Sequence, residues 1–311
     1  MDKIHWSNWE EQFHHWKIES IYIADQTNII DHWLYNNEDR STPIFSATKS
    51  ILSLLIGIAI EKRIFPALDE PLYTVLQEWK MPLPTVDKRI TIEHLLTMTA
   101  GWDWPLFDKP YFQLVHSEQV LQDILSASQK HKPGVTFSYN SGCSYLLGVI
   151  LAKRANMSLL EFAEKHLFEP LHMENVSWNQ LGDYHEGGTG LTMRGCDFIK
   201  LGQLCLWQGE VAGEQLIPAT WITHATKQHH KALLDATPAL HGAFGYHWWS
   251  TPAERNGFTD CYFAYGFSGQ IVVIFPAYNI TIAVKRRATN RKDGAHSKQI
   301  IFDLILPQLL R

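Results

Sequence analysis

One stretch of this sequence, residues 45–62 (FSATKSILSLLIGIAIEK), constrains the fold more than any other. The residues between Ile51 and Ile60 leave almost no polar face, so a helix formed here must be covered on all sides by other elements. The apolar run is about half the ~20 residues that a membrane span needs, and we expect a buried helix from Ser46 onward. Lys49 stands near its start, although burying a charge is costly unless a partner or a reaction requires it.

Strand signals lie at the two ends of the chain. Residues 18–24 and 29–35 are rich in β-branched and aromatic residues and flank the turn sequence DQTN, which predicts a hairpin. After residue 240 the chain again carries short aromatic and β-branched segments separated by Gly, Pro and Asn. The predicted strands there lie within AFGYHWWST, CYFAYGFSG, QIVVIFP and NITIAVKRR, and a last helix is expected from about Gly294 to Leu310.

The middle of the chain has helical spacing instead. Apolar residues recur every three or four positions in TIEHLLTMTAGW, SGCSYLLGVILAKRAN and SLLEFAEKHLFEPL. We therefore predict an α/β (α+β) fold with a sheet domain built from residues 1–65 and 240–311. Residues 66–239 would form an inserted, mainly helical domain, and a ligand would bind in the cleft between the two.

Ser46 and Lys49 form an S-x-x-K pair, and side chains three residues apart are neighbours on a helix. The amino terminus of a helix favours negative charge developing on the serine oxygen. A lysine taken out of water gives up its charge more readily and could accept the serine proton. The alternative is structural: Ser46 caps the helix and Lys49 extends to solvent.

Two further segments carry candidate chemistry. Tyr139, in SYNSG, stands before a predicted helix, where its hydroxyl could pass a proton to a leaving group; its ring could equally pack beside the turn. In AYGFSGQIVVIFP, glycines allow a substrate to approach the backbone, so that the N–H groups of Phe267 and Ser46 could form an oxyanion hole. A bulge or a turn would also explain those glycines.

Taken in order, SATK, PGVTFSYNSG and YGFSGQIVVIFP resemble the serine β-lactamases and penicillin-binding proteins. The resemblance is to the class C β-lactamase-related group, which also holds esterases and 6-aminohexanoate-dimer-hydrolase-like amidases. It covers most of the chain, since ITIEHLLTMTAGW, FEPLHMENVSW and GGTGLTMRGCDFIKLGQLCLWQGEVAGEQLIPATW are similar to the connecting landmarks of that group. The implied fold is β-lactamase/transpeptidase-like, with an antiparallel sheet flanked by N- and C-terminal helices and an inserted helical domain.

The resemblance implies a role for each matched residue. Ser46 is similar to the nucleophile, Lys49 to its base and Tyr139 to the proton-shuttling tyrosine, with the N–H groups of Ser46 and Phe267 as the oxyanion hole. The activity implied is that of a serine hydrolase acting on a small-molecule ester, amide or β-lactam through an acyl-enzyme.

Two departures bear on the substrate. The family's tyrosine motif commonly reads Y-x-N, whereas Ser141 stands in the asparagine position here, beside Asn140. The lysine of the family's K-T-G strand is missing, because Ala264, Tyr265 and Gly266 occupy that place. That lysine helps bind the substrate carboxylate in penicillin-recognising members. Its absence favours a neutral ester or amide, and we expect Ser141, Asn140, Tyr265 and Gly266 to contact the substrate.

Other classes of function are disfavoured. No G-x-S-x-G elbow, H-E-x-x-H, P-loop or dinucleotide fingerprint occurs. A net charge of −5 without long charged runs indicates no nucleic-acid or membrane partner. The four cysteines have no C-x-x-C spacing, which fits reduced structural thiols better than a disulfide framework or a zinc site. We expect no metal and no cofactor. The oligomeric state is open. An acyl pocket could be lined by Trp102, Trp104, Trp248 or Trp249.

The first residues, MDKIHWSNWEEQFHHWK, lack the apolar core of a signal peptide, so we expect a cytoplasmic protein, although a trimmed secreted form would read the same. Two alternatives to the hydrolase stay open. One is a β-lactamase or D-alanyl-D-alanine carboxypeptidase, and the other is a non-catalytic protein that binds or senses an acyl group.

Overall fold

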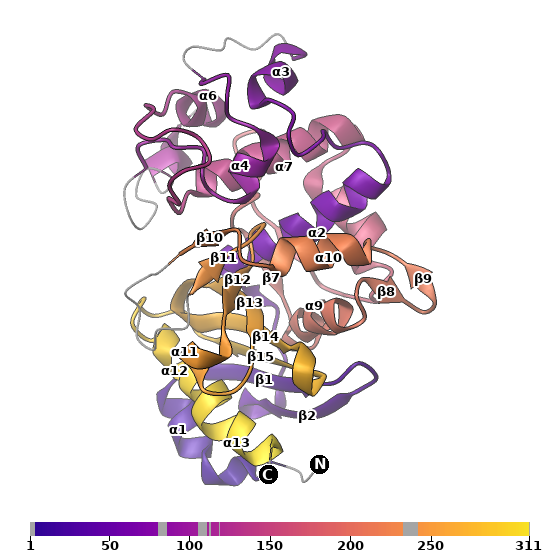
Figure 1. Ribbon diagram of the computed structural model, residues 1–311. Coiled ribbons are helices and arrows are strands. Elements are labelled where there is room, and N and C mark those ends of the chain that lie inside the picture. Colours follow the sequence, from indigo (N-terminus) through magenta and orange to yellow (C-terminus); the bar gives the residue numbers. More distant parts are fainter. Residues whose placement is uncertain are drawn as a thin grey trace.

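The computed structural model describes residues 4–79, 86–104, 111, 113–117, 119–232 and 242–310. Within them, eight strands form one antiparallel sheet in the order β10-β11-β12-β13-β14-β15-β1-β2 (Figure 1). The strands from the two ends of the chain therefore meet where β15 pairs with β1. Their bounds are β1 (Ile18–Ala24), β2 (Ile29–Leu34), β10 (His230–Lys231), β11 (Ala243–Phe244), β12 (Trp249–Thr251), β13 (Cys261–Gly266), β14 (Gln270–Phe275) and β15 (Ile280–Arg286).

The sheet is buried on both faces, because alternate residues of its central strands enter different cores. Ile21 and Ile23 of β1 belong to the core beneath the two terminal helical regions, with Ile301. Tyr22 and Ala24 of the same strand belong to the core on the opposite face. The helices that cover the first face are α1 (Glu10–His15), α12 (Gly294–Gln299), a π-helical turn (Ile300–Ile305) and α13 (Leu306–Leu309).

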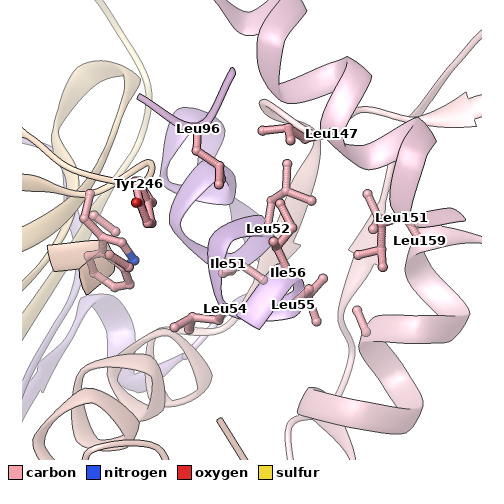
Figure 2. Packing of buried hydrophobic residues seen from close by; sticks show 14 of the residues in the cluster. Ile51, Leu52, Leu54, Leu55, Ile56, Leu96, Leu147, Leu151, Leu159 and Tyr246 are labelled. Carbon is pink, nitrogen blue, oxygen red and sulfur yellow. The ribbon is translucent and has the colours of Figure 1, made fainter. Parts of the chain in front are cut away.

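Helix α2 (Thr48–Glu61) is enclosed as its sequence predicted. Its residues from Thr48 to Ala59 are all buried. Figure 2 shows the helix between Leu147 and Leu151 on one side and Tyr246 on the other. The helix contacts strand β13 as well as the helical region, so it forms a layer between them. A short 3-10 turn, Phe45–Ala47, precedes it.

The helical region lies on the far side of α2 from the sheet (Figure 1). The segments predicted from periodicity form α4 (Ile92–Leu96), α7 (Ser141–Ala155) and α8 (Leu159–Ala163), the last continued by a π-helical turn. Helix α4 ends earlier than the sequence TIEHLLTMTAGW suggested, with Thr97 as its C-cap. The other helices are α3 (Leu72–Gln77), α6 (Val120–Leu125), α9 (Gly195–Leu206), α10 (Ala219–Thr226) and α11 (Ala253–Asn256).

Two elements within residues 66–239 belong to the sheet layer in space. Helix α9 packs on β14, β15 and β1, and strand β10 extends the sheet at its edge. The helix can pack so closely because Gly202 faces Thr281, whose Oγ1 lies 1.9 Å from the position a Cβ would take. The chain thus returns to the sheet before residue 240, where the sequence analysis placed the boundary. Smaller sheets pair β3 (Thr42–Pro43), β7 (Leu191–Met193) and β4 (Ser177–Trp178), β5 (Gln180–Leu181) with β6 (Tyr184–His185), and β8 (Glu210–Val211) with β9 (Glu214–Gln215).

Of the helices described, none combines the length and the hydrophobicity needed to cross a lipid bilayer.

Candidate active site

Ser46 lies in a tight turn in front of α2. Its side chain is half-buried, and the residue before it, Phe45, has φ of +48°, a conformation that is uncommon for a bulky side chain. Neither the 3-10 turn nor α2 has a side-chain cap bond. The alternative interpretation of Ser46 as a helix cap is therefore wrong, and its hydroxyl is left for other contacts.

Lys49 is buried, with 2% of its surface exposed. Its Nζ lies 3.3 Å from Ser46 Oγ, 2.8 Å from Ser141 Oγ and 2.7 Å from the Gly188 carbonyl oxygen. The side chain therefore does not extend to solvent, which was the alternative to a reactive lysine. In the part of the chain that the structure describes, no carboxylate forms an ion pair with it.

The start of α7 explains the two polar residues after the tyrosine. Asn140 is the N-cap of this helix, and its side-chain oxygen accepts bonds from the backbone N–H groups of Gly142 and Cys143. Asn140 is 2% exposed, so its oxygen serves the helix rather than an open cleft. Ser141, the next residue, projects its hydroxyl to Lys49. Of the two residues predicted to contact the substrate here, Ser141 is the one that joins Ser46 and Lys49 in a cluster of contacting polar side chains.

Tyr139 joins the cluster from the loop before α7. Lys49 Nζ lies over its ring, 4.9 Å from the centroid, a cation–π contact. The same ring stacks with Trp249, with centroids 6.0 Å apart and an interplanar angle of 17°. Two aromatic contacts thus fix the plane of the phenol beside the amine.

Strand β13 approaches the Ser46 turn very closely. A Cβ on Gly266 would lie 2.0 Å from the carbonyl oxygen of Ile44, so only glycine fits there. The next residue, Phe267, is 43% exposed, and its ring meets the ring of Phe45 edge-on at 5.6 Å. Gly266 therefore brings the backbone of Phe267 next to the turn that carries Ser46.

Tyr265, the other predicted contact on β13, is surrounded by positive charge. Lys298 Nζ lies 5.2 Å from the ring centroid of Tyr265, and the Lys298 side chain is 1% exposed. Burial raises the pKa of Tyr265 to about 12, although the charges of Arg291 and Arg286 lower it. Burial also lowers the pKa of Arg291, whose charge interacts with both Tyr265 and Tyr139. A guanidinium thus lies near the two phenols although the strand lysine is absent.

Sequence reasoning missed three groups around Lys49. Gly188 supplies a carbonyl, and a Cβ there would lie 3.2 Å from Lys49 Nζ. Glu186, two residues earlier, accepts a bond from the Tyr111 hydroxyl at 3.0 Å; burial raises its pKa, while that bond and the charge of Lys49 lower it. His247 is 1% exposed. The adjacent glycines in HEGGTG were the available signal for the first of these.

The four tryptophans considered for an acyl pocket are all buried. Trp249 stacks on Tyr139 and therefore borders the cluster. Trp104 lies 3.1 Å from the Cβ position of Gly142 at the start of α7. Trp248 packs against Tyr262 instead, with the ring centroids 5.8 Å apart. Among the described residues, no group of three or more His, Cys, Asp and Glu side chains is placed to hold a metal ion.

The chain is similar to several known proteins. The sequence profile of the family described as Beta-lactamase matches residues 21–309. No curated protein sequence matched the chain. Among solved structures, a candidate 6-aminohexanoate-dimer hydrolase from Bacillus anthracis is similar, with a TM-score of 0.78, 19% identity and coverage of 97% of this chain and 81% of that chain.

Two further structures are similar over nearly their whole length. EstCE1, a hydrolase with promiscuous acyltransferase activity, has a TM-score of 0.75 and 17% identity, with 96% of this chain and 97% of that chain covered. A class C beta lactamase from Rhodobacter sphaeroides has a TM-score of 0.72 and 17% identity, with 98% and 99% covered. At such low sequence identity, the structural similarity establishes the β-lactamase/transpeptidase-like fold alone. The profile match over most of the chain establishes the family. The protein belongs to the beta-lactamase family.

Proposed function

We propose that this protein is a serine hydrolase that cleaves a small ester or amide through an acyl-enzyme on Ser46. The observation that carries the proposal is the placement of Lys49: a buried amine 3.3 Å from a serine hydroxyl. Members of this family are generally serine hydrolases, and EstCE1 and the class C beta lactamase are named for such activities.

The contacts of Lys49 suit a base. An ammonium group has three N–H donors, whereas a neutral amine has two donors and one lone pair. The Gly188 carbonyl can only accept, so it takes one donor of the neutral amine. The second donor and the lone pair are left for the two hydroxyls, Ser141 Oγ at 2.8 Å and Ser46 Oγ at 3.3 Å. When Ser141 Oγ accepts the second donor, the lone pair faces Ser46 Oγ. The same contacts that hold the amine out of water therefore orient it to take the serine proton.

The proposed reaction proceeds in two steps. Ser46 Oγ attacks the substrate carbonyl carbon while its proton passes to Lys49 Nζ. The carbonyl oxygen becomes an oxyanion held by the N–H groups of Ser46 and Phe267. Tyr139 passes the proton on to the leaving group, and the carbon–oxygen or carbon–nitrogen bond breaks. Water then hydrolyses the acyl-enzyme, which releases the acid and restores the Ser46 hydroxyl.

The substrate class follows from the strand that lacks the lysine. Ala264 has no charge to offer, and Lys298, whose Nζ lies 5.2 Å from the ring centroid of Tyr265, has only 1% of its surface exposed to a ligand. This favours a neutral ester or amide. One observation favours the second candidate, a β-lactamase or carboxypeptidase: Arg291 interacts electrostatically with Tyr139 and Tyr265 and could bind a carboxylate.

Three assays on one preparation separate these functions. Turnover of p-nitrophenyl acetate without nitrocefin hydrolysis supports the ester or amide hydrolase, and rapid nitrocefin hydrolysis favours the second candidate. A lasting mass adduct after penicillin treatment, or no reaction with any probe, would indicate a protein that binds an acyl group without turnover. Ser46→Ala should abolish turnover. Ser53→Ala, a control that removes a buried serine hydroxyl from α2, should not.

A further inference from the structure

His247 links the elements that carry the reactive cluster. It lies in the turn between β11 and β12 and is 1% exposed. Its backbone φ is +64°, in the left-handed region, which is uncommon for residues other than glycine although Asn, Asp and His adopt it more often than most. Residues held in such conformations persist where the surrounding structure fixes them, and they gather at functional sites. The contacts of His247 show what fixes it.

The imidazole has one defined tautomer. Nδ1 lies 2.8 Å from the carbonyl oxygen of Leu96, the last residue of α4. Because a carbonyl only accepts, Nδ1 carries the proton. Nε2 of the neutral ring is then an acceptor, and Ser144 Oγ, 2.9 Å away, donates to it. Burial, followed by the charge of Lys49, lowers the pKa of His247 to about 3, which agrees with a ring that stays neutral.

The side chain and the main chain of His247 bind two different helices. Its side chain binds Ser144 of α7, one turn after Ser141. Its main-chain carbonyl accepts a bond of 2.8 Å from the hydroxyl of Ser50, which follows Lys49 in α2. Ser141 and Lys49 are themselves 2.8 Å apart between Oγ and Nζ. His247 therefore bridges α2 and α7 close to the contact between Lys49 and Ser141.

The same turn also reaches the tyrosine. Two residues after His247, Trp249 stacks on the ring of Tyr139. Movement of the turn would therefore displace the phenol as well as the helix. We propose that His247 is a positioning residue, whose neutral imidazole and main-chain carbonyl together keep Lys49, Ser141 and Tyr139 in register. The proposal rests on the proposed hydrolase activity for its kinetic consequence but not for its tautomer.

The tautomer is tested first, because its measurement needs no turnover. Nitrogen-15 NMR of the histidine side chains, with the His247 signals assigned by their loss in His247→Asn, should show a neutral ring protonated at Nδ1. This pattern should persist from pH 8 to pH 5. A ring protonated at Nε2, or one that becomes charged in this interval, would overturn the proposal.

Kinetics test the positioning role. Ser144→Ala removes the donor to Nε2, and His247→Asn keeps a side chain that tolerates positive φ but is too short to reach Ser144. Each should lower kcat for p-nitrophenyl acetate by about 10- to 10²-fold, the scale of a misplaced catalytic group, with a smaller change in KM. Ser53→Ala is the matched control, since it deletes a hydroxyl that is buried without a hydrogen-bond partner in the described structure.

The outcomes separate this inference from the proposed function. A wild-type protein that turns over no ester would refute the proposed function, while the NMR spectrum would still decide the tautomer. An active wild type whose Ser144→Ala variant has an unchanged kcat, with only a lower melting temperature, would show that the bridge serves stability alone and overturn the positioning role.

Discussion

Replacing His247 with asparagine should make folding less sensitive to acid. The folded protein keeps this imidazole buried and neutral, and burial together with the charge of Lys49 lowers its pKa from 6.5 to about 3. In the unfolded chain the same group has a pKa of about 6.5. Between these two values the unfolded state binds one proton more than the folded state. The stability that the neutral ring contributes is therefore fully present above pH 6.5 and is lost as the pH falls toward 3.

The size of the effect follows from the interval between the pKa of His247 in the folded protein and its pKa in the unfolded chain. Each pH unit within it costs about 1.4 kcal/mol of unfolding free energy. Between pH 7.5 and pH 5.0 only the part below 6.5 counts, so wild-type protein should lose about 2 kcal/mol on account of His247. Other histidines with lowered pKa values, such as His94 and His185, add to the total loss but are present in the variant as well. The comparison of variant with wild type isolates the single group.

Urea unfolding at the two pH values measures this directly. The wild type should lose about 2 kcal/mol more than His247→Asn on going from pH 7.5 to pH 5.0. His172→Asn is the matched control, because His172 also has positive φ, +49°, but lies on the exposed surface. It should behave as the wild type does. If His247→Asn kept the full acid sensitivity of the wild type, the buried neutral imidazole would not be its source.

Three other substitutions test the placement of the site. Gly266→Ala would put a Cβ 2.0 Å from the Ile44 carbonyl oxygen and displace the Ser46 turn, so ester turnover should fall about 10²-fold; activity within twofold of wild type would contradict this. Asn140→Ala should cost about 1 kcal/mol in urea unfolding through loss of the α7 cap, and no cost would contradict the capping role. Arg286→Met removes the guanidinium donors from the main-chain oxygens of Ser268 and Trp16 and should cost about 3 kcal/mol, whereas an unchanged urea midpoint would exclude this.

The parts of the site that could be predicted are those set by local geometry. Ser46 and Lys49 are three residues apart at the start of a helix, and one helical turn brings their side chains together wherever the helix lies. The apolar sequence of α2 likewise determines that it is enclosed, since almost every face of this helix is apolar and any exposed face would contact water. The hairpin of β1 and β2 follows from the alternating residues and the turn between them.

The remaining contacts depend on how distant segments pack. Gly188 and Lys49 are 139 positions apart in the sequence, and His247 and Ser144 are 103 positions apart, so no local pattern encodes either pairing. The choice between Asn140 and Ser141 shows the same limit at short range. Both side chains can bind an amine, but α7 begins at Ser141, so the residue before it becomes the cap and turns its oxygen to the helix.

The position of α2 explains why the cluster is assembled from so many segments. A helix at the surface could carry a serine and a lysine, but its lysine would be hydrated and its orientation free to change. Helix α2 instead contacts β13 on one side and α7 on the other, so residues of both layers lie beside its amino-terminal turn. Ser141 comes from α7, and the Phe267 backbone continues from β13. Close packing leaves such an interior little room for movement. The enclosure that makes the lysine costly to bury also holds its amine next to the Ser46 hydroxyl.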